Sequence, residues 1–221
     1  MVLEVYLDPC TTNCRKVLAG LDLLGTPFHL NYINYIAGEH KGEEYLKINP
    51  NATVPSAVED GHAITQSNAI LMYAADRDGG NPAYPKDLKQ RANVNQWLLW
   101  EASVWFPSCH VYMVEYAIKP LLKAEPDQTV IDAETPKWNK LATILDNQLE
   151  KTKWICGDQL TIADIAVAAP MQSHAEQRLP LDQYPNLKRW MTEGIEKLPS
   201  WQKTQGAVDK VILALSPNAP M

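Results

Sequence analysis

The segment VPSAVEDGHAITQSNAILMYA, residues 54–74, carries the clearest run of structural signals in the chain. Val54 to Val58 predicts a strand that is entered through a proline, and Glu59-Asp60-Gly61 is a hairpin signal. A further short strand is expected from His62 to Thr65. Ser67 then caps a helix whose apolar residues recur at helical spacing. The segment therefore predicts the order β-β-α.

The residues before this segment add a β-α-β unit. Val2 to Leu7 alternates in character and predicts a strand, which Asp8-Pro9 ends. Thr11 or Thr12 can then cap a helix that closes at Gly25. Phe28 to Ile33 predicts the second strand. The first eighty residues thus read β-α-β-(α)-β-β-α, an α/β domain.

The stretch GGNPAYP, residues 79–85, is the clearest linker, and almost everything after it predicts helix. We expect a long helix from about Asp87 past Trp105, kinked at Pro107, and another with Pro136 in its first turn. The predicted domains are 1–78 (α/β), a linker at 79–86, and 87–221 (all-α). Further helices are expected from Thr161 through Met171, near Leu187 to Lys197 and from Pro199 to Leu213, with a frayed tail from Ser216 to Met221.

Composition excludes several classes of protein. The 221 residues include 20 Lys and Arg against 26 Asp and Glu, a net charge of −6, which argues against a nucleic-acid partner. No apolar run approaches the roughly 20 residues of a membrane span, and Glu4 and Asp8 stand where a signal peptide would be apolar. Four cysteines without a C-x-x-C pair indicate reduced thiols and no metal site. We therefore expect a cytoplasmic protein without a membrane partner.

Three polar features point to a peptide-like ligand. Val54-Pro55 looks like the cis-proline turn of a thioredoxin-like domain, which would offer the Val54 backbone to an extended peptide. Gln66-Ser67 begins a helix, whose free N–H groups and dipole suit a carboxylate. His40-Lys41 could supply cationic donors to a second carboxylate. The implied ligand is short, extended and carboxylated at both ends.

Four stretches in this order resemble the cytosolic glutathione transferases, and together they span essentially the whole chain. They are TTNCRKV (11–17), GEHKGEEYLKINPNATVPSAVEDG (38–61), QSNAILMYAAD (66–76) and LTIADIAVAAP (160–170). The chain is most similar to the theta, phi and bacterial-type classes, which use a hydroxyl rather than a tyrosine. The resemblance implies a thioredoxin-like domain followed by an all-helical one, a homodimer, and glutathione as co-substrate.

The resemblance also implies roles for individual residues. Thr11 matches the catalytic serine of the family, and Thr11-Thr12-Asn13 is similar to bacterial members that use Thr and Asn together. Gln66 stands where many hydroxyl-using classes have Glu. The residues implied to bind glutathione are His40 and Lys41 for the glycyl carboxylate, Thr53, Val54 and Pro55 around the cysteinyl backbone, and Gln66 and Ser67 for the γ-glutamyl group.

Elementary energetics shows that one donor is enough to activate the thiol. A free thiol with a pKa near ~8.5 is only ~3% ionised at pH 7, and lowering that pKa by ~2 units takes about 2.7 kcal/mol. One hydrogen bond to a charged group contributes roughly 1.5–3 kcal/mol. Thr11, Thr12 and Asn13 all remain candidates for the sulfur contact, and for Thr11 a plain N-cap is the competing interpretation.

Cys10 carries the alternative function. It coincides with the cysteine of the beta-type class, and it is either a partly buried thiol or a thiolate whose pKa is lowered by the helix start and by Arg15 and Lys16. A reactive Cys10 would make the protein a glutathione lyase or thiol–disulfide oxidoreductase. A third hypothesis is a non-catalytic, transferase-like interaction module, which would not need to keep Val54-Pro55 or Gln66-Ser67.

The electrophile is expected to bind between the domains, facing Thr11. Its predicted wall comes from the long helix, where core packing is the competing interpretation for each side chain. Aromatic residues favour a small apolar electrophile such as an epoxide, alkyl halide or activated alkene, as in detoxification, and His110 or a tyrosine could protonate a leaving oxygen. The candidates are Trp105, His110, Tyr112, Met113 and Tyr116.

Overall fold

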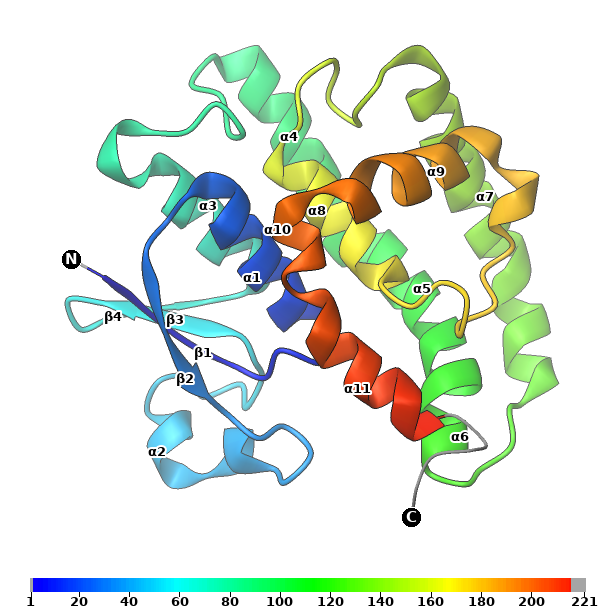
Figure 1. Cartoon of the computed structure of the whole chain (residues 1–221), viewed down its shortest axis with the longest axis horizontal. Coiled ribbons are helices and arrows are strands. Elements are labelled where there is room, and N and C mark those ends of the chain that lie inside the picture. Colours follow the sequence, from blue (N-terminus) through cyan, green and yellow to red (C-terminus); the bar gives the residue numbers. More distant parts are fainter. Residues whose placement is uncertain (1, 216–221) are drawn as a thin grey trace.

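A four-stranded mixed sheet organises the first part of the molecule (Figure 1). The computed structural model describes the backbone of residues 2–215 and the side chains of residues 2–211. The strand order is β2-β1-β3-β4; β1 and β2 are parallel, and the other two pairings are antiparallel. The bounds are β1 Leu3–Leu7, β2 Phe28–Tyr32, β3 Ser56–Glu59 and β4 His62–Thr65.

Helices α1 (Thr12–Leu24) and α3 (Ser67–Asp76) lie side by side against the sheet, and α2 (Glu43–Leu46) lies apart from them (Figure 1). Leu3, Val5 and Leu7 alternate inward from β1 and are fully buried. Asp60 and Gly61 both have positive φ, 51° and 77°, as the predicted hairpin turn requires. This arrangement confirms the thioredoxin-like fold of the N-terminal part.

One long helical path crosses the second part of the molecule. It consists of α4 (Leu88–Trp100), a π-turn (Glu101–Trp105), α5 (Phe106–Met113), a second π-turn (Val114–Ile118) and α6 (Lys119–Leu121). Pro107 lies in the first turn of α5, directly after the π-turn. The N–H of Phe106 donates to the carbonyl of Glu101, five residues earlier, so the path widens just before the proline, which has no N–H to donate.

The prediction for Pro136 is wrong. Helix α7 (Gln128–Lys151) begins eight residues before this proline, which lies inside the helix. Asp127 caps α7, and its carboxylate accepts from the N–H of Thr129 at 2.9 Å. The buried face of the helix, which includes Trp138 and Leu145, offsets the one hydrogen bond that Pro136 removes.

The remaining helices confirm the all-helical character of the second part, although the two that were predicted near the C-terminus are subdivided. They are α8 (Ile162–Ala168), α9 (Pro185–Arg189), α10 (Pro199–Gln202) and α11 (Gln205–Leu215), with short 3₁₀ helices at Arg77–Gly79, Ala169–Met171, Leu181–Gln183 and Ile195–Lys197 and a π-turn at Trp190–Gly194. The predicted tail at 216–221 lies outside the described residues, and the domain limits at 78 and 87 stay predictions.

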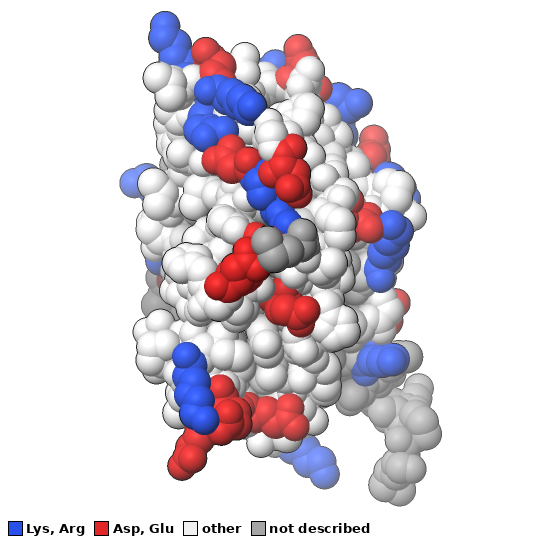
Figure 2. All heavy atoms as spheres, turned by 90° about the vertical axis from the view of Figure 1, so that its left-hand side faces the viewer, with Lys and Arg blue, Asp and Glu red and all other residues white. Residues whose placement is uncertain are grey.

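The surface carries charges of both signs. Figure 2 shows Lys and Arg interspersed with Asp and Glu on one face of the molecule, with broad uncharged areas between them. Within residues 2–215, none of the helices has the combination of length and apolarity that crossing a bilayer requires.

Candidate active site

The turn before β3 offers an unpaired stretch of backbone. The Val54-Pro55 peptide is cis. The side chains of Tyr45 and Asn49 both donate to the carbonyl of Thr53, at 2.6 and 2.7 Å, and thereby hold the turn. Among the described residues, the N–H and C=O of Val54 have no hydrogen-bond partner. This backbone is therefore free to pair with an extended ligand.

The start of α3 is a second open feature. Gln66, the N-cap residue, is exposed and adopts a positive φ of 73°, and its side chain does not cap the helix. The first intrahelical bond runs from the N–H of Ile70 to the carbonyl of Gln66 at 3.0 Å. The N–H groups of Ser67, Asn68 and Ala69 have no acceptor within the described part of the chain. Together with the helix dipole, they form an anion site.

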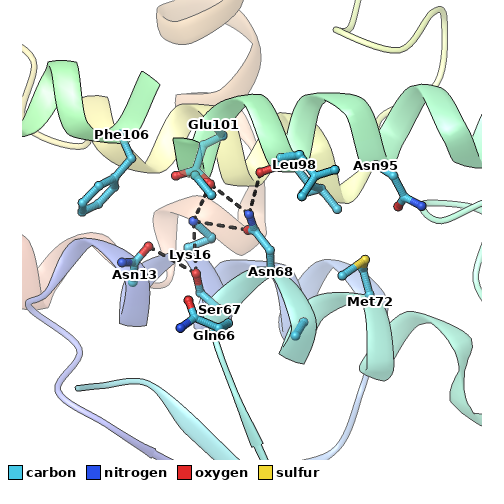
Figure 3. Close-up of a pocket in the computed structure, with 13 residues that line it drawn as sticks. Asn13, Lys16, Gln66, Ser67, Asn68, Met72, Asn95, Leu98, Glu101 and Phe106 are labelled. Atoms are coloured by element: carbon cyan, nitrogen blue, oxygen red, sulfur yellow. Dashed lines mark hydrogen bonds and ion pairs between the residues drawn. The ribbon is translucent and has the colours of Figure 1, made fainter. Parts of the chain in front are cut away.

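A polar chain connects α3 to α1 and to the long helix (Figure 3). The Ser67 hydroxyl donates to Oδ1 of Asn13 at 3.2 Å and accepts from Nζ of Lys16 at 3.1 Å. Lys16 also forms an ion pair of 2.9 Å with Glu101. These residues line one cavity of about 550 Å³, which extends to Phe106 on α5. The structure thus joins Asn13 and Ser67, which lie in different sequence motifs.

The three side chains that could donate a hydrogen bond to the glutathione sulfur differ in whether their protons already have an acceptor within the protein. Thr11 is the N-cap residue of α1, as the competing interpretation has it, but its hydroxyl makes no cap hydrogen bond and donates instead to the carbonyl of Asp8 at 3.2 Å. The Thr12 hydroxyl donates to Sδ of Met113 at 3.6 Å. The amide nitrogen of Asn13 donates to none of the described residues, although Asn13 lines the cavity.

Of the two interpretations of Cys10, the structure favours the partly buried thiol over a thiolate of lowered pKa. Burial raises the pKa of the Cys10 thiol to about 12, and the neighbouring Asp8 contributes in the same direction. The two cations also point elsewhere. Arg15 stacks on Trp201, with 4.1 Å from its guanidinium carbon to the ring centroid, and Lys16 pairs with Glu101. Cys10 therefore lacks the environment of a reactive thiolate.

The His40-Lys41 loop forms a short 3₁₀ helix, Glu39–Lys41. The His40 ring is buried and stacks on Tyr35 with the ring centroids 4.4 Å apart, while Lys41 is exposed. Nδ1 of His40 has no hydrogen-bond partner among the described residues. The loop thus presents one exposed cationic side chain, that of Lys41, and one buried ring, that of His40, which Tyr35 holds in place.

The predicted electrophile wall needs correction at two positions. Trp105 is 0% exposed and donates to the carbonyl of Val167 at 3.0 Å, so it belongs to the core of the helical part. Tyr112 is 3% exposed, and its hydroxyl lies 2.9 Å from that of Thr135. Neither side chain can contact a ligand without repacking of the core.

The other three predicted wall residues are accessible. His110 is exposed and stacks on Phe106, Met113 is half-buried against Thr12, and half-buried Tyr116 lies beneath the guanidinium of Arg178. Sequence reasoning missed Phe106, Lys16 and Glu101. The available signal for Lys16 was its position on the buried face of α1, between Cys14 and Val17, which are both fully buried.

Comparison with known proteins agrees with this geometry. Residues 12–77 match the glutathione S-transferase N-terminal domain family, and residues 109–197 match the glutathione S-transferase C-terminal domain family. The chain is similar to glutathione transferase F7 of Populus trichocarpa, with 28% identity, a TM-score of 0.86, and coverage of 94% of this chain and 99% of the poplar chain.

Two further solved structures are similar over nearly their whole length. Glutathione S-transferase I from maize, in complex with an atrazine glutathione conjugate, is 26% identical with a TM-score of 0.84, covering 95% of this chain and 99% of the maize chain. A delta-class glutathione transferase of Nilaparvata lugens is 27% identical with a TM-score of 0.82, covering 97% and 100%. The fold, the two domain matches and these structures lead to one conclusion: the chain belongs to the glutathione S-transferase superfamily and is a glutathione transferase.

Proposed function

We propose that the protein conjugates glutathione to a small apolar electrophile (an epoxide, an alkyl halide or an activated alkene) and that the Asn13 amide is the principal donor to the sulfur. The observation that carries this proposal is which side-chain donors at the start of α1 are already used in hydrogen bonds within the protein. The hydroxyl protons of Thr11 and Thr12 are donated to Asp8 and Met113, whereas the amide N–H groups of Asn13, beside the cavity, donate to none of the residues that the structure describes.

Glutathione would lie across the three open features. The γ-glutamyl carboxylate fits the unpartnered N–H groups at the start of α3, beside Gln66. The cysteinyl backbone would pair with the N–H and C=O of Val54 as an added strand. The glycyl carboxylate would bind near His40 and Lys41. This placement brings the thiol toward the start of α1.

The reaction then needs few groups from the protein. Loss of the thiol proton to water leaves a thiolate, which the Asn13 amide and the positive end of the α1 dipole stabilise. The thiolate attacks a carbon of the electrophile; a C–S bond forms while a C–halogen or an epoxide C–O bond breaks. With an activated alkene the π bond of the C=C group breaks instead, and the resulting carbanion takes a proton from water. In the epoxide case the departing oxygen takes a proton from water. Burial lowers the pKa of His110, so its neutral ring can relay this proton but does not store one at pH 7.

The electrophile would bind against Phe106, Met113 and His110. Phe106 lines the same cavity as Asn13, His110 stacks on Phe106 with centroids 5.5 Å apart, and Met113 contacts Thr12. This wall is apolar and small, which supports a small apolar substrate. The similar maize enzyme is described with an atrazine glutathione conjugate, which supports conjugation chemistry in this fold.

A titration of bound glutathione tests the proposal. The ultraviolet absorbance of the thiolate would be followed against pH at saturating glutathione in the wild type, Asn13→Ala and Thr11→Ala. We expect a lowered thiol pKa in the wild type, a rise of about 1–2 units in Asn13→Ala, and little change in Thr11→Ala. A large rise in Thr11→Ala alone would assign the donor role to Thr11.

The Cys10-dependent alternative is separated by one more variant. Cys10→Ser is expected to keep conjugation of an epoxide or alkyl halide, because the high pKa of Cys10 leaves it protonated. Loss of turnover in Cys10→Ser would favour a glutathione lyase or thiol–disulfide oxidoreductase.

We also propose a homodimer. Leu88 and Leu99 of α4 are 81% and 70% exposed, and a second copy of the chain would cover such apolar side chains. Light scattering should then give about twice the 24.8 kDa of the single chain.

A further inference from the structure

Lys16 is a buried cation whose hydrogen-bonding capacity is fully used. Its side chain is 2% exposed. Nζ lies 2.9 Å from Oε2 of Glu101, 3.1 Å from Oγ of Ser67 and 3.3 Å from Oδ1 of Asn68. An ammonium group has three N–H bonds and accepts none, so three acceptors match its three donors. The carboxylate of Glu101 supplies the counter-charge that keeps the amine protonated at this depth.

This donor-only group fixes the orientation of its neighbours. The Asn68 amide donates to the carbonyl of Leu98 at 2.9 Å and to Glu101 at 3.0 Å, so its oxygen faces Lys16. The Ser67 hydroxyl must accept from Lys16 because Lys16 has no lone pair to offer. Its one proton is thereby directed away from Lys16, toward Oδ1 of Asn13 at 3.2 Å.

The orientation of Asn13 follows from that of Ser67. When the Asn13 oxygen accepts from Ser67, the amide nitrogen is turned away from the polar chain, as Figure 3 shows. We propose that Lys16 is a positioning residue for glutathione activation: by donating to Ser67 it determines that Asn13 presents its N–H groups, rather than its carbonyl, to the thiolate. This inference rests on the proposed function, since it assigns Asn13 as the sulfur donor.

The direction of donation along the hydrogen bonds from Lys16 to Ser67 and from Ser67 to Asn13 thus depends on one cation, Lys16. Without Lys16, the Ser67 hydroxyl could donate to Glu101 and accept from the Asn13 amide nitrogen, which would turn the Asn13 oxygen toward the sulfur. A carbonyl oxygen beside a thiolate is repulsive. Glutathione can bind without breaking the hydrogen bonds of Ser67, because its γ-glutamyl carboxylate can accept from the open backbone N–H groups at the start of α3.

The test compares Lys16→Met with Arg15→Met. Arg15 is the matched control: it is the adjacent residue on α1, carries the same charge and is equally buried, but it contacts Trp201, Thr204 and Gln172 instead of Ser67. The pH titration of bound glutathione is recorded at saturating concentration. We expect Lys16→Met to raise the thiol pKa by about one unit, a tenfold loss of thiolate, and Arg15→Met to leave it unchanged. Equal shifts in both variants, or none in Lys16→Met, would overturn the proposal.

Two further variants keep the test decisive if Lys16→Met, which leaves Glu101 without its cation, does not fold. Lys16→Met/Glu101→Met replaces the ion pair by apolar groups of similar volume, which buried pairs commonly tolerate. Without Lys16 the Ser67 hydroxyl is no longer obliged to accept, and Asn13 is free to present either end to the sulfur. The thiol pKa should therefore still rise, but by less than in Lys16→Met, because Glu101 no longer draws the Ser67 proton; a wild-type value would refute the role of Lys16. Adding Lys16→Met to Ser67→Ala should give no further rise, because Lys16 acts through Ser67, and an additive rise would contradict that route. A wild type without a lowered thiol pKa would instead contradict the proposed function itself.

Discussion

Helices α8 and α3 begin in opposite ways. At the start of α8, the carboxylate of Asp164 is fully buried and accepts from the N–H of Thr161 at 2.9 Å, its hydroxyl at 3.0 Å, the N–H of Ile155 at 2.8 Å and the indole of Trp190 at 3.1 Å. Together with the Thr161 side chain, which caps the N–H of Asp164, these contacts form a capping box. At the start of α3, none of the described side chains caps the backbone, and the residues there line a cavity.

The difference arises at a single helical position. Asp164 is the third residue of α8, and the residue at the same position of α3 is Ala69. Every helix has N–H groups in its first turn that lack an intrahelical acceptor. In α8 the carbonyl of Ala83 accepts from the N–H of Ile162 at 3.0 Å, the Thr161 side chain caps the N–H of Asp164, and the Asp164 carboxylate accepts from the N-cap N–H, so this helix start is part of the core. Ala69 supplies no such carboxylate, and the first turn of α3 stays open. Four predictions test this contrast.

The largest expected effect is on α8. Asp164→Ala removes the acceptor of four donors in the core and should lower the free energy of unfolding by at least about 3 kcal/mol. Urea denaturation followed by circular dichroism measures it. Asp182→Ala, at an exposed ion pair with Lys188, is the control and should unfold like the wild type. A loss below about 1 kcal/mol in Asp164→Ala would show that the cap is dispensable.

The second prediction transfers the α8 arrangement to α3. Ala69→Asp places a carboxylate where it can accept from the open N–H groups and should weaken glutathione binding at least about tenfold, without loss of stability. Isothermal titration calorimetry measures the affinity. Ala69→Asn has the same shape without the charge and separates repulsion of the carboxylate from steric exclusion. Equal losses in both variants would argue against an anion site.

The third prediction concerns the N-cap of α3. Gln66 has a φ of 73°, a region that glycine adopts readily, and its strained backbone aims an exposed side chain at the site. Gln66→Gly should raise the free energy of unfolding by about 0.5–1 kcal/mol and weaken glutathione binding a few-fold. Paired thermal melts with and without glutathione measure both quantities. Unchanged affinity would remove Gln66 from the γ-glutamyl subsite.

The smallest effect is expected at the start of α1. This helix start lies between the capped start of α8 and the open start of α3, because the carboxylate of Asp8 accepts from the N–H of Cys10 at 3.2 Å, just before the helix. Burial is the largest cause of the high pKa of Cys10, and Asp8 adds to it. Asp8→Asn should therefore lower that pKa from about 12 while leaving it above the ordinary value. Iodoacetamide labelling at fixed pH should become a few-fold faster. Loss of labelling in Cys10→Ser identifies the labelled site. An unchanged rate in Asp8→Asn would show that Asp8 does not raise the pKa of the Cys10 thiol.

Much of the fold could be predicted because its signals are local. Asp60-Gly61 fixes a hairpin and Val54-Pro55 a turn within a few residues of sequence. Pro136 was misplaced because the local rule for proline competes with burial of the α7 face, which depends on distant partners. Trp105 was misassigned for the same reason: its partner, Val167, is 62 residues away.

The candidate site could be predicted only in part. Its motif residues Asn13 and Ser67 were predicted from separate stretches of sequence, and their side chains lie 3.2 Å apart. Lys16 was placed beside Cys10 because the two are close in sequence, but α1 turns its side chain toward Glu101, 85 residues later. Which face of a helix meets which partner is decided by tertiary packing, and a single sequence does not carry this information.

The ion pair of Lys16 and Glu101 has a consequence for how the chain could be divided. Its two charges come from α1 and from the long helical path, on opposite sides of the predicted linker at 79–86. A fragment cut in that linker would retain the cation and lose its anion, and the complementary fragment would retain the reverse. Each part also supplies the surface that buries the charge of the other, so separating the parts would break the ion pair and hydrate both charges; the pair thereby couples the stability of the two parts.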